Sequence, residues 1–189
     1  MPAPSARPLR PAIFVDRDGV LIEHRDDYIL EPAHIKVYQE SIAACLRITL
    51  ESPYALVVVT NQSAIGRGIL TMEQAEALNQ GALKPYEEAG VRIDGAYMCP
   101  HRPDENCDCR KPQPGMLRRA AAELGLDLKR SFLVGDNLSD MGAARAAGAK
   151  GVMVRTGLGS RHLRWAGFDG LVADDLADAV ARILSGEWS

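Results

Sequence analysis

The chain has 189 residues, with 22 Lys and Arg residues against 25 Asp and Glu residues, and a formal net charge of −3 at pH 7. This length suffices for one domain with its own hydrophobic core, and the near balance of charges argues against a nucleic-acid surface or a polybasic membrane surface. No apolar run reaches the ~20 residues that span a bilayer.

Residues 1–11 open the chain with basic side chains but without the apolar stretch that a signal peptide requires. We expect a short disordered tail here, followed by a single domain over residues 12–189. The protein is therefore expected to be cytoplasmic. We also expect a monomer that has no nucleic-acid or membrane partner.

Short apolar segments then alternate with segments of helical periodicity. This alternation predicts an α/β fold, with a Rossmann-like parallel sheet and helices on both of its faces. Within one predicted helix, Thr71 is a candidate N-cap and Pro85 predicts a kink or break. In chain order, strands are predicted over 12–15, 55–60, 93–99, 131–136 and 151–157, and helices over 40–50, 71–90, 115–125, 138–148 and 174–186.

Polar side chains follow three of the predicted strands. Ligands of such sheets bind at the carboxyl ends of the strands, so we expect these side chains to converge on one site. The six residues are Asp16, Asp18, Thr60, Asn61, Asp136 and Asn137.

The first pair raises a question of charge, because Asp16 and Asp18 are spaced i, i+2 and lie on the same side of an extended chain. Their repulsion requires a cation, a shared proton or full solvation. An ordinary turn is one interpretation of this stretch. A calcium loop is excluded, because Val20 and Leu21 occupy positions where an EF-hand needs an oxygen ligand and a glycine.

The functional interpretation gives the two carboxylates different roles. Asp16 would attack an electrophilic phosphorus and form an aspartyl-phosphate. Asp18 would donate a proton to the leaving alkoxide and later take one from water. A magnesium ion held by Asp16 and Asp136 would balance the charge.

The stretch VVVTNQSAIGRG offers a phosphate cradle. Thr60, Asn61, Gln62 and Ser63 would bind substrate phosphate, and the glycines that follow allow a tight turn; a plain polar loop is the alternative. Further along, Lys111 can hold the phosphoryl group in transit.

The neighbouring Arg110 can grip a second anion in bidentate fashion. The alternative for this basic pair is two solvated surface cations.

Three of the four cysteines lie within eleven residues, together with one histidine. In a cytoplasmic chain such a cluster indicates a metal site more than disulfides. Three thiolates and one imidazole complete a closed tetrahedral zinc site, which is typical of structural zinc. Cys45 lies alone in a helical pattern and is expected in the core. The predicted zinc ligands, in the loop 99–109, are Cys99, His101, Cys107 and Cys109.

Four stretches, FVDRDGV, VVVTNQS, CDCRKPQPGM and VGDNLSDMGAARAAG, resemble the motifs of haloacid-dehalogenase (HAD) superfamily phosphatases over about residues 12 to 156. The chain is similar to the D-glycero-D-manno-heptose 1,7-bisphosphate phosphatases and to their relatives, the histidinol-phosphate phosphatases. Both groups carry the Cys/His zinc loop. The resemblance implies a HAD-like fold without a large cap domain.

The resemblance also implies residue roles. Asp16 matches the nucleophile, Asp18 the acid/base, and the magnesium ligands are Asp16, Asp136 and the backbone carbonyl of Asp18. Thr60 and Asn61 match phosphate binders.

Lys111 matches the family lysine, and Arg110 matches the arginine that reads the substrate. Asn137 stands where some heptose enzymes have lysine, and Ala64 where the family usually has glycine. Residues 23–28 correspond to a loop that reaches the substrate.

The expected function is a magnesium-dependent phosphatase that removes the C7 phosphate of a heptose 1,7-bisphosphate, with a structural zinc ion. Hydrolysis of histidinol phosphate is the alternative. A zinc-stabilised phosphate-binding module is disfavoured because all the catalytic side chains are present. A phosphotransferase shares the first chemical step and stays open.

Overall fold

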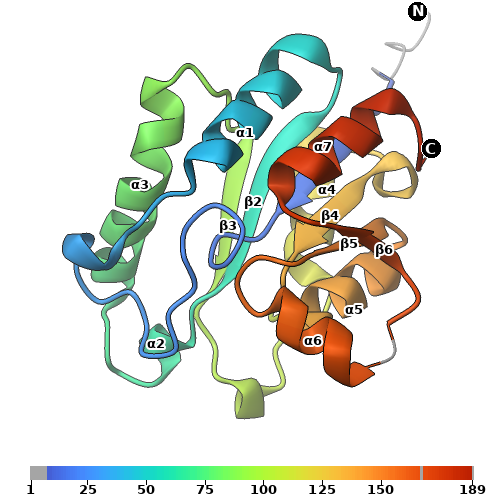
Figure 1. Ribbon diagram of the computed structural model, residues 1–189. Helices are drawn as coiled ribbons and strands as arrows, with labels where there is room; N and C mark the ends of the chain where they lie inside the picture. The colour runs from blue at the N-terminus through green and yellow to red at the C-terminus, as the bar shows by residue number, and fades with distance from the viewer. Residues whose placement is uncertain (1–7, 167, 189) are drawn as a thin grey trace, which may run out of the picture.

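The computed structural model describes residues 8–166 and 168–188, and it contains one six-stranded sheet in which every neighbouring pair of strands is parallel. The strand order is β3-β2-β1-β4-β5-β6. This confirms the predicted parallel α/β architecture (Figure 1). The strands are β1 (Ala12–Val15), β2 (Ala55–Asn61), β3 (Gly95–Cys99), β4 (Phe132–Gly135), β5 (Lys150–Val154) and β6 (Leu171–Ala173).

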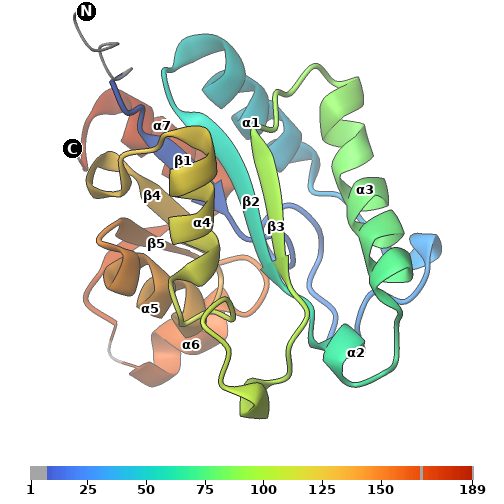
Figure 2. The same ribbon diagram turned by 180° about the vertical axis from the view of Figure 1, so that it is seen from behind.

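Helices cover both faces of the sheet. The face seen in Figure 1 carries α1 (Gln39–Glu51), α3 (Met72–Glu88) and α7 (Leu176–Ser185). The opposite face, seen in Figure 2, carries α4 (Gly115–Leu124) and α5 (Leu138–Ala147). The short α2 (Ser63–Gly66) and α6 (Gly159–Ala166) lie at the end of the sheet where the strands finish. Three single-turn 3-10 helices lie at Pro32–His34, Pro103–Glu105 and Leu128–Arg130.

Strand alternation divides the core into two layers. In β1, Ile13 and Val15 pack with α1 and α7, whereas Ala12 and Phe14 pack with α4 and α5. All four residues are fully buried. A strand buried on both faces needs apolar residues at every position, which explains the unbroken apolar runs of β1 and β2. Cys45 lies in the first layer, as predicted.

Element ends differ from the sequence prediction in a few places. Helix α3 begins after Thr71, whose side chain forms a capping box with Gln74, and it runs through Pro85 without the predicted break. Strand β3 begins at Gly95 and not at residue 93. Asp94 bonds to Leu56 in β2, because its backbone N–H donates to the Leu56 carbonyl, but the Leu56 backbone N–H donates to the Asp94 carboxylate and not to a backbone carbonyl, so the regular ladder begins at Gly95.

Residues 10 and 11, which the sequence analysis assigns to the tail, make contacts with the sheet and its surroundings. Arg10 donates its backbone N–H to the Gly125 carbonyl and pairs its guanidinium with Asp94, and the Pro11 carbonyl accepts from the Ala55 backbone N–H. Residues 1–7 of the predicted tail lie outside the described residues.

No large cap domain interrupts the part of the chain that the structure describes. The longest excursion between a strand and the next helix is the segment between β1 and α1. Among the described helices, none combines the length and apolar character that crossing a bilayer would need.

A buried tyrosine hydroxyl makes one of the contacts between α3 and the segment that joins β1 to α1. Tyr86 is 1% exposed, and its hydroxyl donates to the Leu21 carbonyl at 2.6 Å. That carbonyl also accepts the Tyr38 backbone N–H at 3.0 Å, so loss of the hydroxyl leaves it one partner.

We predict that Tyr86→Phe lowers the free energy of unfolding by about 1 kcal/mol, the usual net worth of one hydrogen bond. Urea denaturation is the measurement. Tyr54→Phe is the matched control, because the Tyr54 hydroxyl makes no hydrogen bond within residues 8–166 and 168–188. Equal effects of the two substitutions would show that the Tyr86 hydroxyl does not stabilise this segment.

Candidate active site and metal centres

The carboxyl ends of β1, β2 and β4 open into one cleft of about 480 Å³. A larger cleft of about 920 Å³ lies between α3 and the start of α4, but none of the strand-end carboxylates lines it. The structure thus brings together all six side chains predicted to converge, whereas Ser63, which was predicted to bind phosphate, does not line the cleft. The cleft is lined by Asp16, Arg17, Asp18, His24, Arg25, Asp26, Tyr28, Ile29, Thr60, Asn61, Gln62, Arg110, Lys111, Asp136, Asn137, Ser139 and Leu158.

Lys111 lies at the bottom of this cleft with a side chain that is 1% exposed. Its ammonium group lies 2.9 Å from Asp16 Oδ1 and 2.6 Å from Asp140 Oδ1, and it donates to the Val59 carbonyl at 2.9 Å. Burial alone lowers a lysine pKa, but the carboxylates of Asp140 and Asp16 outweigh it and raise the pKa of Lys111. The group is therefore a fixed positive charge.

Asp140 was missed by the sequence analysis. It is completely buried in the first turn of α5, where its Oδ2 accepts the backbone N–H of Asn137 at 3.1 Å. The sequence pattern around Asp140 is that of a capping box, in which Asn137 is the N-cap residue and Asp140 follows three residues later. That pattern predicts a helix start and gives no hint of the ion pair with Lys111.

Two glycines pack closely against the Asp136 carboxylate. A Cβ at Gly19 would lie 2.1 Å from Asp136 Oδ2, and a Cβ at Gly157 would lie 2.0 Å from the same atom. Both glycines have positive φ, at 87° and 53°. The Leu158 backbone N–H donates to Asp136 Oδ2 at 2.8 Å. The chain turns at both glycines so closely around this carboxylate that no larger residue fits.

The buried carboxylates fit a divalent cation. Carboxylate oxygens of Asp16, Asp136 and Asp140 all lie within 4.8 Å of one another. Burial raises the pKa of Asp136 to about 6 and that of Asp16 well above its usual range, as expected where carboxylates lack enough positive charge. Oxygen donors of this kind are what magnesium prefers.

A count of charges gives the same result. In the buried group at the bottom of the cleft, Asp16, Asp136 and Asp140 contribute three negative charges and Lys111 supplies one positive charge, while Asp18 is paired with Arg17. Two negative charges are left for a divalent cation to balance. The backbone carbonyl of Asp18, which was predicted as a magnesium ligand, accepts no hydrogen bond from any described residue. Its oxygen is therefore available to bind a divalent cation.

Asp18 stands among hydrogen-bond donors at the cleft wall. Arg17 Nη2 lies 3.0 Å from both of its carboxylate oxygens. Gln62 Nε2 donates to Asp18 Oδ2 at 2.8 Å, and Thr60 Oγ1 donates to the same oxygen at 3.3 Å. The carboxylate is 24% exposed and faces the cleft.

Two of the predicted phosphate binders are placed differently from the expectation. The Asn61 side chain accepts the Lys111 backbone N–H and donates to its carbonyl, both at 3.1 Å, so its amide mainly fixes Lys111. Ser63 lies in α2 and is absent from the cleft wall.

Arg110 lies at the cleft wall, where its Nη1 donates to the His101 carbonyl at 3.2 Å. Asn137 also lines the cleft, and its Oδ1 accepts the Ser139 backbone N–H. The loop 23–28 contributes His24, Arg25, Asp26 and Tyr28 to the lining of the cleft.

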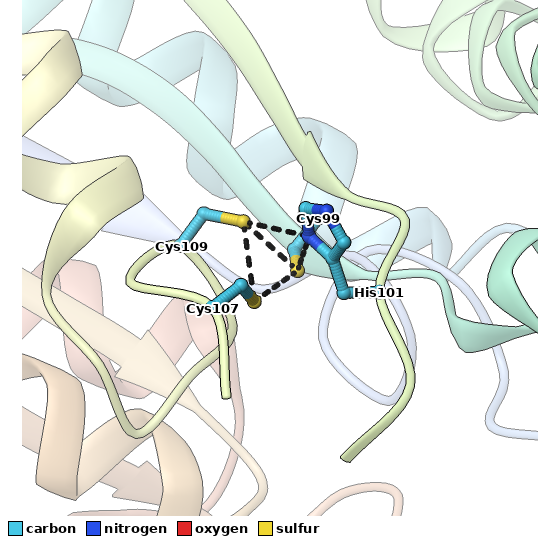
Figure 3. Close-up of side chains that lie close together, drawn as sticks. All are labelled: Cys99, His101, Cys107 and Cys109. Atoms are coloured by element: carbon cyan, nitrogen blue, oxygen red, sulfur yellow. Dashed lines mark hydrogen bonds between the residues drawn. The ribbon is translucent and has the colours of Figure 1, made fainter. Parts of the chain in front are cut away.

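The four predicted zinc ligands come together beside this site, at the end of β3 and in the loop that follows (Figure 3). Distances between the sulfurs run from 3.1 to 3.6 Å, and His101 Nδ1 lies 3.2 Å from Cys109 Sγ. Sulfurs at ~2.3 Å from one zinc ion in a tetrahedron lie about 3.8 Å apart, so the donor set has nearly the size that zinc requires.

Comparisons with known proteins agree with this geometry. A HAD-hydrolase-like family model matches residues 108–179. The D-glycero-beta-D-manno-heptose-1,7-bisphosphate 7-phosphatase of Yersinia pestis is 45% identical over 157 residues, covering 78% of this chain and 81% of that protein. The protein of the same name from Pseudomonas aeruginosa is 38% identical over 176 residues, covering 93% of this chain and 98% of the other.

A solved structure extends the likeness to the fold. The D,D-heptose 1,7-bisphosphate phosphatase of B. bronchiseptica, solved with magnesium and phosphate, superposes with a TM-score of 0.86 at 34% sequence identity. The match covers 93% of this chain and 99% of that one.

We predict that Lys111→Met destabilises the fold by about 3–5 kcal/mol, because it leaves the buried Asp140 carboxylate without its cation. Adding Asp140→Asn to the same chain should recover part of that loss. Urea denaturation in magnesium-free buffer measures both. Lys84→Met is the matched control, since Lys84 is 70% exposed and pairs with Glu88 at the surface. A loss for Lys111→Met as small as the control's would mean that the ion pair does not support the fold.

Proposed function

This chain belongs to the HAD-like D-glycero-D-manno-heptose 1,7-bisphosphate phosphatase family, and from that premise we propose that it removes the C7 phosphate of the heptose 1,7-bisphosphate. As a member of this family it is a phosphoric monoester hydrolase. The names of its relatives specify the β anomer, and we extend that preference to this chain.

One observation carries the choice of a bisphosphate. Arg17 and Arg25 are paired with Asp18 and Asp27, and the cleft has two further cationic side chains in separate places. Lys111 is buried beside Asp16, and Arg110 lies at the wall, where it donates to the His101 carbonyl. The transferred phosphate would lie against Lys111, and the second phosphate would meet the planar guanidinium, which binds phosphate in bidentate fashion.

The reaction would begin at Asp16, whose carboxylate lies 2.9 Å from the Lys111 ammonium and faces the cleft. One carboxylate oxygen forms a bond to the C7 phosphorus as the bond from phosphorus to the sugar oxygen breaks. Asp18 gives its proton to that oxygen, and the heptose 1-phosphate leaves. Asp18 then takes a proton from water, which attacks the phosphorus and frees the Asp16 carboxylate together with inorganic phosphate.

Magnesium, held by Asp16, Asp136 and the Asp18 carbonyl, would supply the positive charge that lets an anionic carboxylate approach an anionic phosphate. Thr60, Asn61 and Gln62 line the same cleft, where the transferred phosphate would lie. Asn61 would act through Lys111, whose backbone it fixes from both sides.

The zinc ion would be structural. Its four ligands leave no open position, and Cys109 directly precedes Arg110 and Lys111. The loop 99–109 has few apolar residues with which to form a core, so a metal would fix its shape and, with it, the position of Arg110.

A comparison of two substrates tests the proposed function. We predict that kcat/KM in the presence of magnesium is larger for heptose 1,7-bisphosphate than for histidinol phosphate, since only the bisphosphate offers an anion to Arg110. Phosphate release with the two substrates in parallel is the measurement. A larger kcat/KM for histidinol phosphate would replace the proposed substrate with the alternative.

The proposal that Arg110 and Lys111 bind different phosphates gives a second prediction. Arg110→Ala should raise the transition-state barrier for the bisphosphate by roughly 1.5–3 kcal/mol, as expected for loss of a charged hydrogen bond. It should change the hydrolysis of a small monophosphate ester far less. Lys111→Ala, in contrast, should damage both substrates alike. If Arg110→Ala lowers kcat/KM equally for both substrates, the second-phosphate role is wrong.

The zinc assignment predicts a single zinc ion that survives exhaustive dialysis into magnesium-free buffer, as measured by elemental analysis. Cys107→Ser should lose this metal and lower the melting temperature, because a structural zinc contributes folding free energy directly. Cys45→Ala is the control, since Cys45 lies in the core away from the cluster and should leave the zinc content unchanged. Less than about half a zinc ion per chain in the unaltered protein would contradict the assignment.

A further inference from the structure

We propose that Arg17 is a positioning residue that holds the Asp18 carboxyl group where, in its protonated form, it can give its proton to the leaving group. The proposal rests on the acid/base role given to Asp18 above. Arg17 stands between the two carboxylates of the first strand end, yet its side chain is only 2% exposed.

The guanidinium has one charged partner and one neutral partner. Its Nη2 lies 3.0 Å from each carboxylate oxygen of Asp18, and its Nη1 donates to Asn79 Oδ1 on α3 at 3.3 Å. The buried Nε has no hydrogen-bond partner among the described residues. Burying a guanidinium costs much free energy unless a carboxylate compensates it, so the Arg17 side chain is bound to remain at Asp18.

Asp18 also accepts a hydrogen bond from Gln62, whose Nε2 donates to Asp18 Oδ2. The same Nε2 donates to Thr60 Oγ1 at 2.9 Å. Gln62 is itself buried. Rotation of the Asp18 carboxylate would break contacts on both sides at once. The series Asn79, Arg17 and Asp18 therefore links the proposed acid to a helix on the face of the sheet.

The backbone of Arg17 has a structural role that is separate from its side chain. The Arg17 carbonyl accepts the backbone N–H groups of Val20, Leu21 and Ile22, which forms the turn after β1. These bonds do not involve the side chain and remain when it is replaced. The side chain is directed at Asp18, which the fold of the turn does not require.

The role predicts a dependence on the leaving group. An alkoxide needs a proton as its bond to phosphorus breaks, whereas p-nitrophenolate is a weak base and leaves without one. Loss of a well-placed general acid costs about a hundredfold or more in rate. We therefore expect Arg17→Gln to lower kcat/KM by about a hundredfold for a primary alkyl phosphate, but less than about tenfold for p-nitrophenyl phosphate.

The experiment measures kcat/KM for these two esters in the presence of magnesium with Arg17→Gln, Asp18→Asn and the double variant. In the Asp18→Asn background, Arg17→Gln should add less than about a threefold further loss for the alkyl ester, because the two residues then act through one group. Asn79→Ala, at a partly exposed position, should change kcat/KM for the two esters in the same direction as Arg17→Gln, but by a smaller factor. It also serves if Arg17→Gln does not fold. Gln80→Ala, at an exposed position on the same helix, is the matched control.

The outcomes separate the two claims. If Asp18→Asn lowers kcat/KM equally for both esters, the acid role of Asp18 is wrong and the proposed chemistry fails. If Asp18→Asn is selective for the alkyl ester, but Arg17→Gln and Asn79→Ala are not, the positioning role is overturned and the proposed chemistry stands. Fully additive losses in the double variant would overturn it as well.

Discussion

A single buried ammonium group, that of Lys111, lies between two carboxylates at the carboxyl end of the sheet, and the rest of the site is arranged around it. Asp16 and Asp140 reach it from β1 and α5, the Val59 carbonyl accepts a hydrogen bond from it, and Asn61 fixes its backbone. A charge buried this deeply is stable only while its partners stay in place, so three elements are held together by one interaction. The same interaction leaves the neighbouring Asp136 short of positive charge and ready for a divalent cation.

The Cys/His loop that follows β3 carries the lysine of this arrangement. Lys111 comes from the segment after β3, which has little apolar content and lies outside the sheet. Four donor atoms gathered at Cys99, His101, Cys107 and Cys109 can fix that segment with a metal. The loop 23–28 and Arg110 both contribute side chains to the lining of the cleft.

Much of this could be predicted from the sequence, because parallel strands end on the same side of a sheet. Asp16, Thr60 and Asp136 follow apolar runs, and alternation alone places them together. Asp140 could not be found in this way, since its spacing after Asn137 is also that of an ordinary capped helix. The side-chain role of Asn61 depends on a partner 50 residues away, and local sequence carries no information about such a contact. Strand β6 and helix α6 were missed because short elements have too few residues to show a period.

The central claim is that Asp16 receives the phosphoryl group, and the most direct test is to trap that adduct. Turnover in the presence of magnesium is quenched rapidly, the denatured protein is reduced with tritiated borohydride, and the labelled peptide is mapped. Borohydride reduces an aspartyl-phosphate to homoserine, so the account predicts tritium at position 16, and none in Asp16→Asn. Label at another residue, or substantial turnover by Asp16→Asn without label, would contradict it.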